Sequence, residues 1–474
     1  MALICIIDIV VIAVLVGIAF TQGLERALPF FTFAVTLIPD ESKFHIPGLI
    51  DLSTARLAVL TLLILYFVTG ASQSESRGSE VLPLKWIMAL NVLCGLISTV
   101  HSVDPGTSLK TVVNQVIDYF MVYFIFFRTV TTKDTVRRIL VSMVRAMAVC
   151  CVFGVIQAYY FWTPISLFPT VQGRLGIGAA LIEDMERGLR INATFPHAIL
   201  YGVGLTLSIP LALYLLNDAR NLREKVFLQV SLLLMFWNIY KTSSRGPWLG
   251  LTLALALLVV FAQGATRKHL LTLGILTVLV LVIRPGVRET VENDYLSTFN
   301  PDTSAGSSYQ GRWDILDKCK RVVATDFGRT LWGFGPETFP LLGLEAVNGE
   351  GHVVPMLSCD SSWFQSIAET GYLGLVSLAL LLLAPMLLTL RNIRRFPRPD
   401  NFLFSLLFIL QLSFAFMMVS VASYAWGQQT YMFWILVAIA MRSAPWVENR
   451  SEPGRKPDPV FQNAEVRLRE LVAN

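Results

Sequence analysis

The chain has 474 residues, of which 54% are hydrophobic and 15% are charged. Soluble globular domains carry about 25% charged residues, so this composition excludes a pair of ordinary soluble domains and indicates a polytopic membrane protein. The formal net charge of +5 is modest, and the positions of the basic residues are more informative than their sum. The first apolar stretch lacks a basic lead-in and a small-residue cleavage site, so we expect no cleaved secretory signal.

Apolar stretches of about 17–25 residues predict the membrane-spanning helices. In chain order they lie near residues 2–20, 26–39, 55–70, 84–101, 109–128, 138–161, 197–216, 226–241, 248–263, 269–284, 363–390, 402–424 and 428–442. The first two are short or close together, so the sequence predicts about 12 or 13 spans. The expected fold class is therefore an all-α polytopic membrane protein.

The basic connections set the predicted orientation of these spans. They lie at residues 128–138, 217–225, 265–269 and 391–399. Loops rich in Lys and Arg face the cytoplasm. The sequence therefore predicts that the loops on the opposite side are external; these are residues 40–54, 102–108, 162–196, 242–247, 285–362 and 425–427.

This topology divides the chain into four predicted parts. They are a transmembrane bundle at 1–284 with an external loop at 162–196, a large external loop at 285–362, C-terminal transmembrane helices at 363–442 and a cytoplasmic tail at 443–474. The large loop lies between the tenth and eleventh predicted spans. Loops of this length on a compact protein are usually functional or disordered. Because this loop carries aromatic residues, we expect a folded cap with short helices.

Three arginines fall on the predicted external side, namely Arg190 in RINATFP, Arg245 in SSRGPW and Arg312 in QGRWDIL. Each alone is consistent with an arginine that contacts lipid headgroups. Together they would form a cluster of guanidinium groups near the membrane surface, suited to bidentate binding of phosphate. The cluster therefore suggests a lipid-linked phosphate or diphosphate substrate.

Three acidic or titratable residues lie where the large loop re-enters the membrane. Asp360 fits either a helix N-cap or a general base that deprotonates a hydroxyl. His352 is a second candidate base, or a solvated loop histidine. Glu369 lies inside the apolar helix, and we expect it to hold helices together by hydrogen bonds.

Two further pairs of residues are singled out by their positions. Asp118 and Arg145 lie at similar depth in adjacent predicted spans, so we expect a structural ion pair between them. Cys319 and Cys359 are the two cysteines outside the predicted spans, and the sequence leaves open whether they form a disulfide or remain thiols. Nucleotide-binding and metal-binding motifs do not occur, so we expect no metal, no cofactor and no nucleic-acid partner.

These motifs, taken in order, resemble the O-antigen ligase and O-antigen polymerase superfamily. SSRGPWLGL is similar to its Ser-Arg-Gly signature, and the GRWDIL and GFGPETF segments follow in the long external loop as in that family. SSWFQSIAETGYLGL resembles the family element that ends in Glu-x-Gly-x-x-Gly, and RINATFPHAILYG resembles an Arg-containing segment. The resemblance covers roughly residues 190–390 by motif.

The resemblance implies a metal-independent, inverting membrane glycosyltransferase with a helical fold of the GT-C kind. Such enzymes act on the outer face of the bacterial inner membrane and transfer a glycan from an undecaprenyl-diphosphate donor to an acceptor hydroxyl. Arg245 and Arg312 would then hold the diphosphate with help from Arg190. The chain departs from the ligase pattern at Asp360, where ligases commonly carry His, so the base is either Asp360 or His352.

This departure favours a polymerase of O-antigen or exopolysaccharide, whose acceptor is another lipid-linked glycan. The alternative is a ligase that transfers the polymer to lipid A–core or to a protein hydroxyl. A chain-length regulator is a candidate further partner, besides the membrane lipids. A flippase for lipid-linked sugars is the alternative of another class, but it predicts two related halves that the sequence does not contain. A sensor or scaffold without catalytic activity is a third class.

Overall fold

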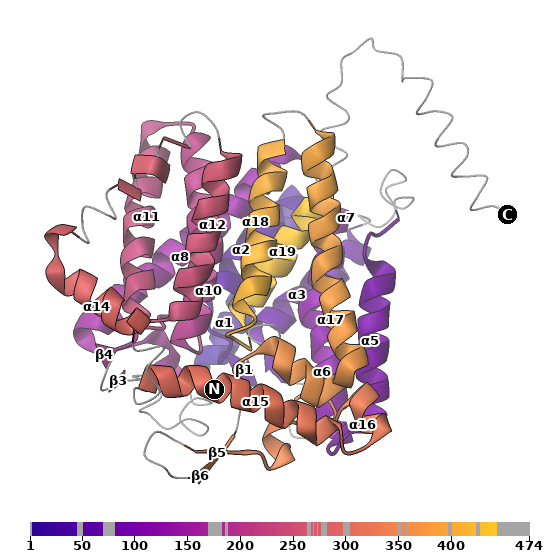
Figure 1. Cartoon of the computed structure of the whole chain (residues 1–474). Coiled ribbons are helices and arrows are strands. Elements are labelled where there is room, and N and C mark those ends of the chain that lie inside the picture. Colours follow the sequence, from indigo (N-terminus) through magenta and orange to yellow (C-terminus); the bar gives the residue numbers. More distant parts are fainter. Residues whose placement is uncertain are drawn as a thin grey trace.

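The structure is a computed structural model of the whole chain, in which helices account for most of the described residues (Figure 1). It describes residues 2–44, 51–69, 81–168, 183–184, 188–262, 267–268, 270–272, 274–275, 282–296, 304–347, 353–356, 359–396, 401–422 and 427–442. The tail at 443–474 and half of the tenth predicted span at 269–284 lie outside these residues.

Each of the other twelve predicted spans coincides with a helix or with consecutive helical segments. They are α1 (Ala2–Gln22), α2 (Leu24–Leu37), α3 (Thr54–Val68), α5 (Lys85–Val100), α6 (Pro105–Gln115) continued by η1 (Val116–Met121) and α7 (Val122–Thr129), α8 (Lys133–Tyr160), α10 (Ala198–Asn217), α11 (Leu222–Lys241), α12 (Arg245–Phe261), α17 (Ser362–Arg395), α18 (Asn401–Met417) and α19 (Gln428–Arg442). The prediction of an all-α polytopic membrane protein is therefore confirmed.

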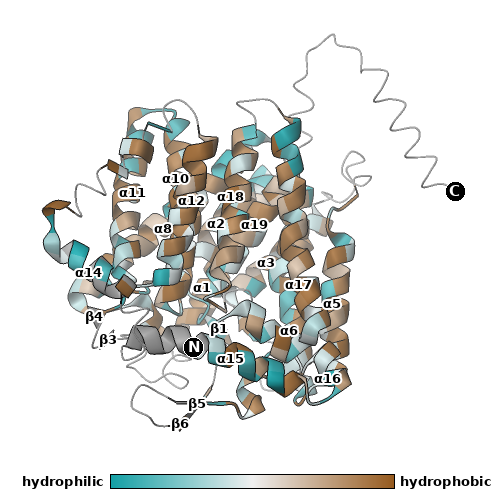
Figure 2. Ribbon diagram, viewed as in Figure 1, coloured by the Kyte–Doolittle hydropathy of each residue, from teal (hydrophilic) through white to brown (hydrophobic). Residues whose placement is uncertain are grey.

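Five of the described helical segments are long and apolar enough to cross a membrane, and the apolar residues form a band across the bundle (Figure 2). They are Ala2–Gln22, Pro105–Thr129, Lys133–Tyr160, Ala198–Asn217 and Ser362–Arg395. Four shorter apolar helices, α3, α5, α12 and α18, lie beside them. Because α10 is apolar around its whole circumference, it is buried along most of its length at the centre of the bundle.

The loop between α7 and α8 and the loop between α10 and α11 meet at one end of the bundle, which we call the basic end. Arg137 pairs with Asp218 at 3.0 Å and with Glu224 at 2.6 Å. In this second contact the arginine comes from the other loop: Arg220, between α10 and α11, pairs with Asp134 at the start of α8 at 2.8 Å. Two of the predicted positive loops are thus joined to each other, which agrees with their assignment to one face.

The opposite end, which we call the cap end, carries the described helices and strands of residues 285–361 (Figure 1). These are α14 (Pro285–Leu296), α15 (Ser304–Val323), α16 (Phe327–Trp332), the 3₁₀ turn η5 (Phe339–Leu342) and an antiparallel hairpin of β5 (Glu345–Val347) with β6 (Val353–Pro355). Two further short hairpins pair β1 (Lys43–Phe44) with β2 (Leu52–Ser53) and β3 (Glu183–Asp184) with β4 (Gly188–Leu189). The 3₁₀ turn η2 (Pro164–Leu167) follows α8.

The cap is fixed to the membrane helices by two close backbone contacts, each made at a glycine. Gly371 interrupts α17 with a φ of 67°, and Gly333 follows α16 with a φ of 71°. A side chain on Gly371 would overlap the backbone of Leu331, and one on Gly333 would overlap the backbone of Glu369. Both positions therefore require glycine, because L-residues rarely adopt this conformation and there is no space for a Cβ atom.

The predicted ion pair between Asp118 and Arg145 is wrong. Asp118 lies in the π-helical turn η1, where Arg56 binds its carboxylate through Nε and through Nη2 at 2.9 Å. The hydroxyl of Tyr431 donates to the same carboxylate at 2.6 Å. Arg145 is exposed on α8. Similar depth along two helices did not predict the partner, because the π-turn rotates Asp118 toward α3 and α19.

Candidate functional site

The segment at 190–196 enters the bundle at the cap end and is held there by Gln157 of α8. Gln157 is fully buried, and its Oε1 accepts hydrogen bonds from the amides of Asn192 at 2.9 Å and Ala193 at 2.8 Å. Its Nε2 donates to Oδ1 of Asn192 at 2.6 Å. One side chain thus satisfies the backbone of an irregular buried segment, whose amides would otherwise destabilise the fold.

This segment brings Arg190 against the turn between α11 and α12. Its Nε donates to the carbonyl of Thr242 at 3.1 Å, and its Nη2 donates to Oγ of Ser244 at 2.9 Å. Arg190 itself is only 9% exposed. Ser243, between its two partners, has a positive φ of 45°, a strained conformation that is found most often at functional sites.

Arg245 is the first residue of α12, directly after this turn. Its neighbours Gly246 and Pro247 lie in the first helical turn, where proline needs no amide partner, so they start the helix rather than break a span. The first turn of a helix has free amides and a partial positive charge. Together with Arg190 and Arg245, it makes this corner of the cap end suited to an anion.

The turn at 417–421 after α18 joins this corner to the start of α17. On one side, Gly246 packs so closely on Ser420 that a Cβ would overlap its hydroxyl. On the other side, the amide and hydroxyl of Ser362 donate to the carbonyl of Val421, and Oγ of Ser361 donates to Met418 at 3.3 Å. The turn at 417–421 therefore contacts both the start of α12, which carries Arg245, and the start of α17, which follows Asp360. We call this turn the shared wall.

Asp360 is exposed at this point, immediately before α17. The N-cap of α17 is Ser361, whose side chain accepts a hydrogen bond from the amide of Phe364. The prediction that Asp360 caps this helix is therefore wrong, and its carboxylate is left on the surface. Residue 361 could have been recognised as the cap, because serine is among the strongest N-cap residues.

Arg312 lies on α15, which packs against α17. The next residue, Trp313, is exposed, and its ring lies 6.5 Å from the ring of Phe364 in the first turn of α17. The helix of Arg312 thus reaches the start of α17 near Asp360. The other candidate base, His352, lies outside the described residues.

Glu369 is buried below the cap, in the part of α17 before the Gly371 interruption. Its carboxylate accepts hydrogen bonds from Gln365 at 2.9 Å and from the amide of Phe339 at 3.3 Å. Its carbonyl accepts from the hydroxyl of Ser98 at 2.7 Å. These contacts join the cap, α5 and α17, as expected for a residue that holds elements together.

His197 caps α10 and lies near Arg190. Its Nδ1 accepts a hydrogen bond from the amide of Ile199 at 3.2 Å. Burial, together with the smaller effect of the positive charge of Arg190, lowers the pKa of His197 to about 4. The imidazole is therefore neutral at pH 7, and the second positive charge that would repel Arg190 is avoided.

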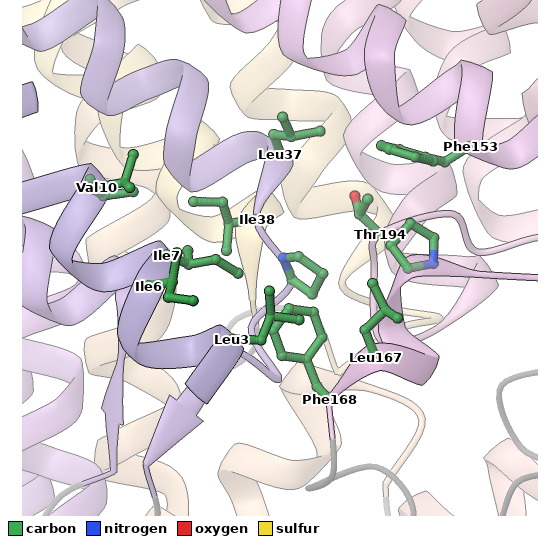
Figure 3. A pocket seen from close by; sticks show the side chains of 13 residues that line it. Leu3, Ile6, Ile7, Val10, Leu37, Ile38, Phe153, Leu167, Phe168 and Thr194 are labelled. Atoms are coloured by element: carbon green, nitrogen blue, oxygen red, sulfur yellow. The ribbon is translucent and has the colours of Figure 1, made fainter. Parts of the chain in front are cut away.

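An apolar groove of about 380 Å³ lies beside the same segment (Figure 3). It is lined by α1, the end of α2, Phe153 of α8 and the residues around η2. Of its described lining residues, Thr194 alone has a polar side chain. Thr194 belongs to the segment that carries Arg190, so the groove and the anion-binding corner are built on one stretch of chain.

The comparison with known protein families identifies the part of the chain that holds most of these residues. Residues 230–379 match the family described as O-antigen ligase. This match supports the expected resemblance of the chain to the O-antigen ligase and polymerase superfamily. The match includes the α11–α12 turn, the cap and the start of α17, while Arg190 and the turn at 417–421 lie outside it. No curated protein matches the chain significantly.

Two parts of the site were not predicted from the sequence. Gln157 resembles any polar residue in an apolar helix, and only its contact with a segment 35 residues away gives it a role. The turn at 417–421 follows an ordinary apolar helix and carries a single serine in VSV. The paired serines of SSWF were a usable signal, since two adjacent hydroxyls at a helix start predict capping and a further contact.

Proposed function

We propose that this protein is a polysaccharide polymerase that transfers a glycan from an undecaprenyl-diphosphate donor to the hydroxyl of an acceptor glycan. The observation that carries the proposal is the shared wall at 417–421. It supports a site in which arginines on one side face a carboxylate on the other, as a donor diphosphate and an acceptor hydroxyl require.

On the donor side, Arg245 and Arg312 bind the diphosphate, and Arg190 orients the α11–α12 turn and adds positive charge. A lipid-linked donor also needs a place for its isoprenoid chain. The apolar groove beside Thr194 supports that requirement, because it continues from the segment of Arg190. Guanidinium groups then take the role of a metal ion in stabilising the leaving diphosphate.

On the acceptor side, Asp360 acts as the general base. It accepts the proton of the acceptor hydroxyl while the oxygen attacks the anomeric carbon and the bond to the diphosphate breaks. A single displacement of this kind inverts the anomeric configuration. The exposed ring of Trp313, next to Phe364, offers an apolar surface for a sugar ring close to this base.

The proposed site lies at the outer face of the bacterial inner membrane. Support comes from the ion pairs that join two positive loops at the basic end, since the site is at the opposite end. At that face, lipid diphosphates supply the activated sugar. A chain-length regulator would be an additional partner there.

The test uses purified protein with a lipid-diphosphate oligosaccharide. A polymerase extends the lipid-linked glycan, whereas a ligase transfers it to added lipid A–core. We expect Arg245→Ala and Arg312→Ala to lower glycan transfer by at least ~100-fold while the protein still inserts into the membrane. The matched control is Arg138→Ala at the basic end, which should keep its activity. Wild-type polymer lengths from both site variants would contradict the proposal.

A further inference from the structure

The cap contains a pair of buried cysteines in one apolar cluster. Cys319 on α15 is 0% exposed and Cys359, directly before Asp360, is 1% exposed. They lie in one apolar cluster with Phe339, Met356 and Ala368. The hydrogen bond between the two thiols, together with burial, raises the pKa of Cys359. Both cysteines are thiols in this structure, and they share this cluster although they are far apart in sequence.

The other four cysteines are placed differently. Cys5, Cys94, Cys150 and Cys151 all lie in helices of the transmembrane bundle. Cys150 contacts the hydroxyl of Thr194, and Cys151 accepts a hydrogen bond from the hydroxyl of Tyr201. Only the pair in the cap shares one apolar cluster outside the membrane helices.

We infer that Cys319 and Cys359 are joined by a disulfide bond that fastens α15 to the start of α17. The inference rests on the outward location of the cap in the proposed function, because disulfides persist in oxidising compartments. The bond forms by exchange with an oxidised protein dithiol of the thiol-oxidase class. The two cysteines lose two protons and two electrons, and the disulfide of the oxidase is reduced to two thiols.

The bond would connect the two elements that carry opposite halves of the proposed site. Cys319 follows Arg312 by about two turns of α15. Cys359 is adjacent to Asp360. A covalent link at this place limits how far the helix of Arg312 can move from the chain that carries Asp360. The contact of Trp313 with Phe364 reinforces the same junction without a covalent bond.

The experiment counts thiols in the full-length protein. Cells are quenched with acid, the protein is denatured, and free thiols are coupled to a maleimide of high mass before electrophoresis. With the bond present, wild-type protein couples at four of its six cysteines without reductant and at all six after reduction. Cys319→Ser and Cys359→Ser each free the partner thiol, so each couples at five with or without reductant. Peptide mass spectrometry then detects the joined peptides, lighter by two hydrogens than the pair of thiols.

Two controls make the result decisive. Cys94→Ser, in a membrane helix, should remove one coupled thiol and leave the reductant-dependent pair intact. In the Cys319→Ser/Cys359→Ser background, Leu341→Cys places a thiol at an exposed cap position, and a membrane-impermeant maleimide applied to spheroplasts reports the side of the cap. Labelling there together with six free thiols in the wild type would overturn the disulfide alone. Absence of labelling, with six free thiols, would overturn both the disulfide and the outward location.

Discussion

Gln157 and Asn192 exchange two hydrogen bonds, one from Gln157 Nε2 to Asn192 Oδ1 at 2.6 Å and one from the Asn192 amide to Gln157 Oε1 at 2.9 Å. This exchange fixes the segment that places Arg190. We expect Gln157→Leu to lower activity by more than ~10-fold, because it leaves buried amides unpaired at about 1–3 kcal/mol each. Thermal unfolding in detergent measures the loss of stability, and a glycan-transfer assay measures the loss of activity.

The matched control for this variant is Gln411→Leu. Gln411 is equally buried in α18, but it donates only to Thr389, and its carbonyl oxygen has no hydrogen-bond partner. We expect its replacement to keep activity within about twofold, because a polar atom without a partner gives little stability. Equal losses of activity from both variants would contradict a specific role for Gln157.

The hydrogen bond between Arg190 and Ser244 predicts energetic coupling of the two residues. Ser244→Ala should lower glycan transfer several-fold, and it should have little further effect once Arg190 is replaced by Ala. A double-mutant cycle measures this coupling, which we expect at about 1–3 kcal/mol. Ser231→Ala is the control, because Ser231 is also buried but donates only within its own helix. Additive losses from Ser244 and Arg190 would exclude the coupling.

The two candidate bases predict opposite rankings of two variants. Asp360→Asn keeps the size of the side chain but removes its ability to accept a proton, so it should lower kcat by about 100-fold or more. His352→Ala should have a much smaller effect. Steady-state kinetics of the two variants distinguishes them. The reverse ranking would assign the base to His352.

The low pKa of His197 predicts a loss of stability in acid. Its folded-state pKa of about 4 lies below the ordinary value of 6.5, so protonation favours the unfolded state. The stabilisation is complete above pH 6.5 and is lost as the pH falls toward 4. His197→Asn keeps a side chain that can cap α10 but does not titrate. The melting temperature should therefore depend less on pH in this variant, and an unchanged dependence would contradict the assignment.

The ion pairs at the basic end predict a change in stability without a change in chemistry. Arg137→Ala removes bonds to Asp218 and Glu224 and should cost about 1–2 kcal/mol. Arg138→Ala removes a more exposed pair with Asp134 and should cost less than about 0.5 kcal/mol. Thermal melts rank the two variants, and both should keep the wild-type kcat. A large drop in kcat for Arg137→Ala would mean that the basic end takes part in the reaction.

The spans could be predicted because apolar length and loop charge are local properties of the chain. The partner of Asp118 could not, since a π-turn changes which neighbour a side chain faces, and apolar composition does not reveal that turn. Ser361 as the cap of α17 was predictable from helix-capping rules but was assigned one residue early.

The candidate site was predicted as a set of separate motifs rather than as an arrangement. SSRGPW and RINATFP carry recognisable arginines, and their contact through Thr242 and Ser244 follows only from the folded chain. The shared wall at 417–421 involves residues without distinctive chemistry. Contacts between distant segments depend on the packing of whole helices, which a single sequence does not specify.

The close approach of Gly333 to Glu369 and of Gly371 to Leu331 also decides how this protein can be recombined with its relatives. The cap is not a detachable module, because the loop after α16 and the interruption of α17 occupy space that only two glycines leave open. A chimaera that takes a foreign cap must therefore take the matching stretch of α17 with it. If the junction of the chimaera lies after Gly371, within the regular part of α17, then Gly333 and Gly371 come from the same parent protein.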